Sequence, residues 1–130
     1  MSKQLRIRES AENYLKAIYI LRDRLGEVRS VDVATELGVS KPSVSVAVKK
    51  LRNDGLVNMD ENHYLLLTKE GLEYAAYIFG RHVILEEFFT DVLEIDKKTA
   101  HNDSCRLEHI VSSEMLSKIK CMNDEKHNSQ

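Results

Sequence analysis

The chain has 130 residues, of which 42% are hydrophobic and 31% charged, and its formal net charge is −2 at pH 7. This balance is typical of one soluble globular domain, or of a small domain that shares its core with a helical extension. It excludes a membrane-spanning or disulfide-dependent chain. The first ten residues contain no apolar run ended by small residues, so we expect no secretory signal and a cytoplasmic location. Both cysteines, Cys105 and Cys121, are then expected to be reduced thiols.

Helical periodicity begins close to the start of the sequence. The first predicted helix runs from about Arg8 to Arg24, and Gly26 ends it. Its apolar residues recur at steps of three and four: Tyr14, Ile18, Leu21 and Leu25. Such a stripe is the core-facing side of an amphipathic helix.

Two short helices joined by a tight turn are predicted next. Their apolar residues lie on either side of the turn Gly38-Val39-Ser40: Val33, Ala34 and Leu37, then Val44, Ala47, Val48 and Leu51. Ser40 is placed to cap the second helix, and Pro42 lies in its first turn, where a missing amide hydrogen costs little. The small residue Ala34, followed four positions later by Gly38, has the spacing of a helix-turn-helix.

After Gly55 the pattern becomes that of a small β-hairpin. The apolar segments Leu56–Met59 and Tyr64–Leu67 flank a polar tip at residues 60–62. A hairpin directly after a helix-turn-helix is the wing of a winged helix-turn-helix.

The rest of the chain is predicted to be helical. Thr68 is placed to cap a long helix that continues to about Val92, and further helices are expected over about Lys97–Ile110 and Ser113–Cys121. The polar residues from Asn123 onward predict a frayed tail. The long helix carries more apolar side chains than a three-helix domain needs, which predicts a partner subunit. These side chains are Leu72, Ala75, Ala76, Phe79, Val83, Leu85, Phe88 and Phe89.

The second helix of the helix-turn-helix has the local positive charge that DNA contact requires. Residues 40–52 contain four basic side chains and no acidic one. Lysine and arginine on the face opposite the apolar stripe would bind phosphates, and serines near the helix start can reach base edges. We therefore predict DNA contacts from Ser40, Lys41, Pro42, Ser43, Ser45, Lys49 and Arg52. The alternative is an ordinary amphipathic helix with a solvated basic face.

Metal-ligating side chains cluster in the predicted helix 97–110. Cys105, Glu108 and His109 share one helix face, with His101 one turn earlier. A thiolate, a carboxylate and an imidazole around one point form a transition-metal site. Taken alone, Cys105 is ordinarily interpreted as a small buried apolar residue.

The long helix carries a second pair of candidate ligands. His82 and Glu86 are four residues apart and can form another site together with His101. The alternative is a helical ion pair or hydrogen bond between them. Cys121 has no matching neighbours and is interpreted as structural or exposed. His63 in the hairpin and His127 in the tail are interpreted as bystanders.

Four stretches of the sequence carry a resemblance to a known family. They are Glu12–Tyr19, Ser40–Ser45, Asp54–Val57 and Cys105–His109, and together they extend over nearly the whole chain. The chain resembles the metal-dependent repressors of the diphtheria toxin repressor and manganese transport regulator family. The resemblance implies a homodimer that binds a palindromic operator in double-stranded DNA when it is loaded with a divalent transition metal.

The resemblance also implies how the ligands are divided. In the iron-responsive branch, the primary site uses a methionine of the first helix and three residues that match Cys105, Glu108 and His109. The ancillary site uses residues that match His82, Glu86 and His101.

Two positions depart from that pattern. Asn13 stands where the iron branch has the methionine and the manganese branch an aspartate, and Lys16 stands where the manganese branch has a second glutamate. A cation at Lys16 would repel a metal ion, which argues against a two-manganese arrangement. The sequence also ends without the C-terminal SH3-like domain of longer iron-branch proteins, so we expect the ancillary site to be incomplete or completed by water.

Together these features predict a mostly α protein. We expect a winged helix-turn-helix DNA-binding domain over residues 1–70, a helical metal-binding and dimerisation domain over residues 71–122, and a flexible tail over residues 123–130. The function expected is that of a metal-responsive transcriptional repressor of metal-homeostasis genes, neither an enzyme nor bound to a membrane.

Because Cys105 is a soft donor, we expect Fe(II) as the cofactor, with Zn(II), Co(II), Ni(II) and Mn(II) as alternatives. Two other hypotheses remain open. One is a winged-helix regulator that responds to an organic ligand or to thiol oxidation, and the other is a small metalloenzyme.

Overall fold

The computed structural model describes residues 7–128 and divides the chain into two compact units. The first unit ends at Ala76 and the second begins at Tyr77. Part of the segment on which the expected absence of a secretory signal depends, residues 1–6, lies outside the described residues. The same is true of residues 129–130 of the expected tail.

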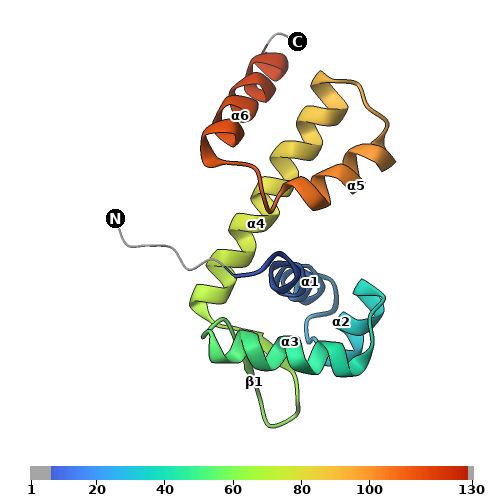
Figure 1. The fold of residues 1–130 in the computed structure, drawn as a ribbon, viewed down its shortest axis with the longest axis vertical. Coiled ribbons are helices and arrows are strands. Elements are labelled where there is room, and N and C mark those ends of the chain that lie inside the picture. Colours follow the sequence, from blue (N-terminus) through green and yellow to red (C-terminus); the bar gives the residue numbers. More distant parts are fainter. Residues whose placement is uncertain (1–6, 129–130) are drawn as a thin grey trace. The chain divides into compact units, whose positions relative to one another are not determined.

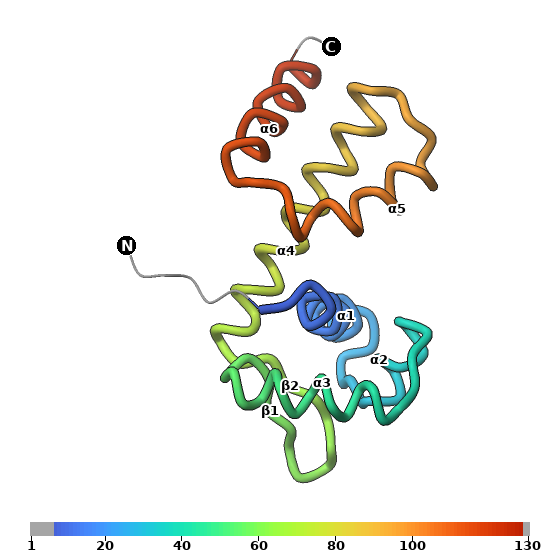
Figure 2. The backbone as a smooth tube through the Cα atoms, in the orientation of Figure 1, coloured from blue at the N-terminus to red at the C-terminus, as the bar shows by residue number. Residues whose placement is uncertain are grey.

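Three helices and a β-hairpin build the first unit (Figure 1, Figure 2). They are α1 Glu9–Leu25, α2 Ser30–Leu37, α3 Lys41–Asn53, β1 Val57–Met59 and β2 Leu65–Leu67. The most deeply buried side chains are mainly apolar: Leu15, Ile18, Val28, Val33, Val44, Leu51 and Val57. The predicted winged helix-turn-helix is confirmed.

Local residues determine the turn between α2 and α3. Gly38 has a φ of 66°, in the left-handed region that favours glycine. The hydroxyl of Ser40 accepts a hydrogen bond from the backbone N–H of Ser43 at 3.2 Å, and Pro42 lies in the first turn of α3. The start of α3 is therefore as the sequence predicted.

The wing is an antiparallel pair of short strands with an ordered tip. The carboxylate of Asp60 accepts hydrogen bonds from the backbone N–H groups of Asn62 and Tyr64, each at 2.9 Å. His63 between them has a φ of 66°. The guanidinium of Arg29 lies 4.4 Å from the centre of the Tyr64 ring. Side-chain hydrogen bonds and one cation–π contact thus order a tip that has little apolar support.

The long helix α4, Lys69–Glu87, begins in the first unit and continues into the second. Thr68 caps it, because its hydroxyl accepts from the backbone N–H of Gly71 at 3.0 Å and donates to the Gly55 carbonyl at 2.7 Å. Gly71 lies directly against the backbone of Leu56, where an added Cβ would be 1.9 Å from the carbonyl oxygen. Only glycine fits this approach of α4 to the end of α3 and the wing.

The second unit contains the end of α4 and three further helical segments. They are η1 Phe88–Val92, α5 Lys97–Leu107 and α6 Ser113–Asn128 (Figure 1). The chain stays helical to Val92 as predicted, but its last turn is a wider π-helix. α5 ends at Leu107, three residues before the predicted end, and Glu108 follows it as the C-cap residue.

The predicted tail is wrong for residues 123–128, because α6 continues through Asn128. Asn123 is buried, and its side-chain amide donates a hydrogen bond to the backbone carbonyl of Ile84 at 3.1 Å. Ile119, one turn earlier, is also buried, and α6 packs against η1. Tertiary packing therefore holds a helix whose polar composition does not predict it.

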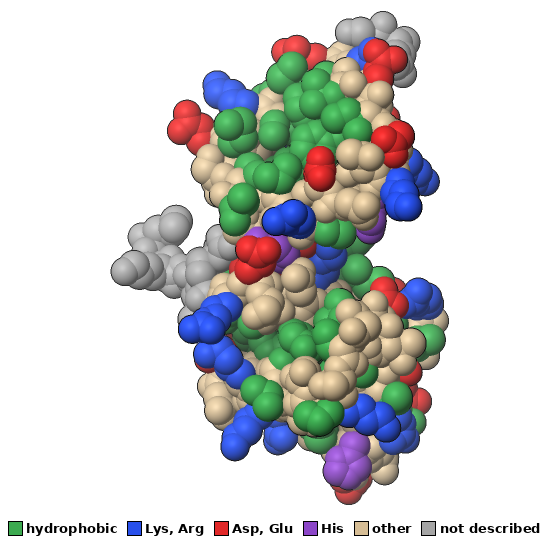
Figure 3. All heavy atoms as spheres, turned by 45° about the vertical axis from the view of Figure 1, so that its right-hand side comes forward, with side chains coloured by type: hydrophobic (Ala, Val, Ile, Leu, Met, Phe, Trp, Pro, Cys, Tyr) green, Lys and Arg blue, Asp and Glu red, His purple; other side chains and the backbone are tan. Residues whose placement is uncertain are grey.

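The interior of the second unit is rich in polar and charged side chains: Arg81, His82, Ser104, Glu108, His109 and Asn123. Several large apolar side chains are instead exposed: Val83, Leu93, Ile110, Met115 and Met122. Apolar side chains gather on the surface of this unit, drawn in green in Figure 3. Of the predicted apolar surplus, Val83 is exposed but Leu85 is buried. None of the described helices is long and apolar enough to cross a membrane.

Candidate functional site

The outward face of α3 carries the side chains that were predicted to contact DNA. Val44, Val48 and Leu51 are buried, which turns the opposite face of the helix outward. All seven predicted residues are exposed: Ser40, Lys41, Pro42, Ser43, Ser45, Lys49 and Arg52. With no acidic side chain from residue 40 to residue 52, this face suits a helix that enters a groove between phosphates.

Val46 belongs to the same face and was not predicted as part of it. Its exposed fraction, 72%, is the highest among the exposed large apolar residues of the described chain. An exposed apolar side chain on a groove-entering helix can contact the methyl group of thymine. The signal was present in the sequence, because Val46 lies two residues after the buried Val44 and therefore off the buried stripe.

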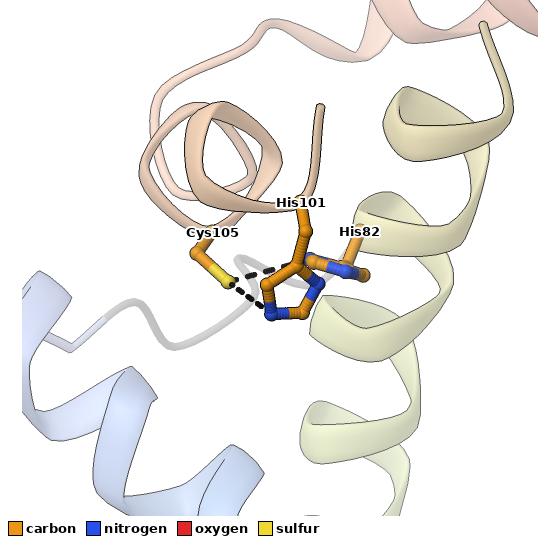
Figure 4. A group of neighbouring side chains, drawn as sticks. All are labelled: His82, His101 and Cys105. Atoms are coloured by element: carbon orange, nitrogen blue, oxygen red, sulfur yellow. Dashed lines mark hydrogen bonds between the residues drawn. The ribbon is translucent and has the colours of Figure 1, made fainter. Parts of the chain in front are cut away.

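The candidate metal ligands come together from two helices (Figure 4). His82 lies on α4, and His101 and Cys105 lie on α5. The sulfur of Cys105 is 3.6 Å from Nε2 of His101 and 3.9 Å from Nδ1 of His82. The ligand atoms of the three residues lie within 4.8 Å of one another. Two imidazoles and a thiol at this spacing can bind one metal ion.

Glu86 joins the two histidines. Its Oε1 lies 2.7 Å from Nε2 of His82 and 2.9 Å from Nδ1 of His101. Burial is the largest single influence on the pKa of Glu86 and raises it, but the hydrogen bonds and the electrostatic attraction of His101 and His82 together lower it by more, so the pKa falls below its usual value. The carboxylate is therefore ionised at neutral pH, the form that binds a metal.

His82 also extends the cluster to the end of α5. Its Nδ1 lies 2.8 Å from Oε1 of Glu108, which is completely buried, and Oε2 of Glu108 lies 3.5 Å from Nε2 of His109. The groups predicted for the two sites thus adjoin each other, with His82 between Glu86 and Glu108. We call these groups the main cluster: His82, Glu86, His101, Cys105, Glu108 and His109.

Arg81 positions the end of α5 and was missed in the sequence. This buried guanidinium donates to the backbone carbonyl of Glu108 at 2.6 Å, to the carbonyl of Val111 and to the hydroxyl of Tyr77 at 2.9 Å. It therefore holds the backbone that carries Glu108 beside His82. A basic residue next to His82 was visible in the sequence, but its burial depends on contacts with residues about 30 positions later.

The main cluster as defined does not include Asn13 or Cys121. Asn13 lies on α1 in the first unit and is half-buried, and its part in metal binding stays a prediction. Cys121 lies exposed on α6, in agreement with one of the two interpretations given to it. The division of the main cluster into a primary and an ancillary set also stays a prediction.

The donors of the main cluster fit a divalent transition metal. Thiolate and imidazole favour Fe(II), Co(II), Ni(II) and Zn(II), whereas carboxylates also suit Mn(II). The carboxylates of Glu86 and Glu108 and the thiolate of Cys105 can offset the charge of bound metal. A metal ion held by these residues would link α4 to α5.

Two models from one protein family match consecutive parts of the chain. Residues 6–64 match the family model of the iron dependent repressor N-terminal DNA binding domain. Residues 68–128 match that of the iron dependent repressor metal binding and dimerisation domain.

Relatives of this family align over most of the chain. The transcriptional regulator MntR of Escherichia coli O157:H7 is 36% identical over 95% of this chain and 78% of its own length. The diphtheria toxin repressor of Corynebacterium glutamicum is 31% identical over 93% of this chain, which spans only 53% of that protein.

A solved structure of a metal-dependent regulator is also similar to this chain. This structure, that of the manganese regulator SloR, superposes with a TM-score of 0.78 at 32% identity, over 88% of this chain and 53% of that one. The chain thus spans about half the length of some of its relatives. It belongs to the iron-dependent repressor family of metal-dependent transcriptional regulators.

Proposed function

We propose that this protein is a homodimeric repressor that binds a palindromic DNA operator when a divalent transition metal occupies the main cluster. The observation that carries the proposal is the gathering of six metal-ligating side chains in the second unit of a chain whose first unit exposes an acid-free α3. A two-fold dimer presents two copies of α3, which suits a palindrome. The exposed apolar side chains of the second unit support a dimer contact there.

On DNA, some side chains of α3 are proposed to contact phosphates and others to contact base edges. Lys49 and Arg52 contact phosphates, which contributes affinity and salt dependence but no sequence preference. Ser43, Ser45 and Val46 lie nearer the start of the helix and meet base edges. The wing follows α3 in the chain and can reach the neighbouring sugar-phosphate backbone of the DNA.

Iron(II) is the proposed activator, with a lower response to manganese(II). Cys105 supplies the soft donor, and manganese(II) lies lowest in the affinity series for such sites. Lys16 and Asn13 stand where manganese-branch proteins carry acidic ligands. The relatives are named for iron and for manganese, so the metal preference has to be measured on this chain. We propose a regulatory and not a catalytic role for the metal.

The test is operator affinity of the metal-free protein after addition of one metal at a time under reducing, anaerobic conditions. The operator is a palindromic duplex selected from random DNA by the iron-loaded protein. Iron(II) or zinc(II) should raise affinity at lower concentration than manganese(II). Cys105→Ala should weaken the metal response by about tenfold or more, and Cys121→Ala is the matched control. An unchanged response in Cys105→Ala would mean that the effector binds elsewhere.

A further inference from the structure

A second group of metal-ligating side chains lies on the second unit, outside the main cluster. Glu87 is the last residue of α4, Asp91 lies in the π-helical turn η1, and His127 lies in the last turn of α6. Their ligand atoms all lie within 4.8 Å of one another. We call this group the α6 cluster. His127 belongs to the segment that was predicted from the sequence to be a frayed tail.

His127 is hydrogen-bonded to Asp91 in the α6 cluster, and the distances there also suit a shared ion. Nε2 of His127 is 3.3 Å from Oε2 of Glu87 and 3.2 Å from Oδ2 of Asp91. Charge-assisted hydrogen bonds are shorter, about 2.7–2.9 Å. Donor atoms that bind one ion at about 2.0–2.2 Å lie about 2.8–3.6 Å apart at octahedral to tetrahedral angles. Both distances fall in that range.

One imidazole is the shared partner of both carboxylates in the α6 cluster. At the α6 cluster two carboxylates face one ring nitrogen, and that nitrogen carries at most one proton. One N–H can reach both oxygens only as a shared three-centre hydrogen bond, whereas a cation placed among the three atoms can bind all of them.

The donors also define the class of ion. Two carboxylates and one neutral imidazole give a net charge of −2, which matches a divalent cation. One nitrogen and two oxygens suit Mn(II), Fe(II), Co(II) and Zn(II), and the imidazole disfavours Mg(II) and Ca(II). The side chains of His127 and Asp91 are 50% and 46% exposed, so water can complete the coordination. π-helical turns such as η1 often occur at functional sites.

We propose that Glu87, Asp91 and His127 form an additional site for a divalent transition metal. Metal bound there fastens the last turn of α6 to the end of α4 and to η1. This site shares no ligand with the main cluster and contains no thiol, so we expect its affinities for manganese(II) and iron(II) to differ less than those of the main cluster.

The experiment measures metal binding by the full chain, starting from metal-free, reduced protein. Equilibrium dialysis with cobalt(II) gives the number of ions bound per subunit at saturation. We expect His127→Gln and the double variant Glu87→Gln, Asp91→Asn each to bind one ion fewer than the wild type. Asp124→Asn is the matched control, because Asp124 is also an exposed carboxylate on α6 and lies 3.4 Å from Lys120. It should bind as many ions as the wild type.

A second measurement needs no variant of the site. The ¹⁵N chemical shift of His127 Nε2 is followed by NMR as zinc(II) is added to wild-type protein, and a shift to the metal-bound value is expected. Equal stoichiometry in all variants, or an unchanged His127 signal under saturating zinc(II), would reduce the α6 cluster to an ion pair and overturn the proposal. If a variant lost the helicity of α6, the wild-type NMR signal alone would decide.

Discussion

The two units of the chain are built around different kinds of interior. In the first unit the least exposed side chains are chiefly apolar, and Leu15, Val33, Val44 and Leu51 are all 0% exposed. In the second, Glu108 and Ser104 are as deeply buried, while Ile110 is 69% exposed. The first unit therefore gains its stability from hydrophobic burial, whereas the second buries groups that are costly to desolvate.

The polar interior of the second unit is only partly balanced by hydrogen bonds. Among the described residues, the hydroxyl of Ser104 and the side-chain oxygen of Asn123 are buried without a hydrogen-bond partner. Breaking a buried polar pair leaves its members uncompensated. We infer that the second unit depends on bound metal and on a partner subunit for part of its stability, and that the first does not.

The largest effect is expected from Gly71→Ala. A Cβ at Gly71 would lie 1.9 Å from the Leu56 carbonyl oxygen, so α4 or the backbone before the wing has to move. We expect the free energy of unfolding of the first unit to fall by about 3 kcal/mol or more. Gly80→Ala in the same helix is the control, because nothing lies within 4 Å of its added Cβ. It should be neutral or stabilising by up to about 1 kcal/mol. Thermal unfolding of both variants measures the difference.

Arg81→Met tests the polar interior of the second unit. The substitution leaves the buried carbonyl of Glu108 without its donor, at a cost of about 1–3 kcal/mol, and removes the donor of the part-buried Val111 carbonyl at a smaller cost. Metal affinity should fall too, since Arg81 positions the backbone of Glu108. Arg106→Met makes the same chemical change at an exposed position of α5. It should lower the free energy of unfolding by less than about 0.5 kcal/mol. Equal losses in the two variants would show that Arg81 has no special structural role.

Metal addition should stabilise the two units unequally. At a free metal concentration of about 100 Kd, the second unit should gain about 2.7 kcal/mol. Hydrogen exchange read by NMR resolves the units, and slower exchange is expected at backbone amides of α5. The amides of α3 are the internal control. A uniform slowing in both units would contradict the inference that only the second depends on metal.

The same contrast explains how far the sequence could predict each unit. The start of α3 follows from Ser40 and Pro42, which act within one turn of helix. The pairing of His82 with Glu108 joins residues 26 positions apart. The end of α6 depends on Asn123 reaching Ile84, 39 positions earlier. Helix caps and periodicity depend on neighbouring residues and can be predicted from them. A polar interior depends on contacts between side chains that are far apart in the sequence. The residue types of the candidate site could therefore be proposed from the sequence, but the contact of His82 with Glu108 could not.

The smallest effect concerns the cap of α3. Ser40→Ala removes the hydroxyl that accepts from the backbone N–H of Ser43, and the free energy of unfolding of the first unit should fall by about 1 kcal/mol. Ser45→Ala changes an exposed serine inside the same helix and should stay within about 0.5 kcal/mol of the wild type.

Urea unfolding, with and without saturating metal, measures both variants. Because the cap lies in the apolar-cored first unit, the loss in Ser40→Ala should be the same in the two conditions. A loss that disappeared on metal binding would mean that metal also stabilises α3. The stabilities of the two units would then be coupled.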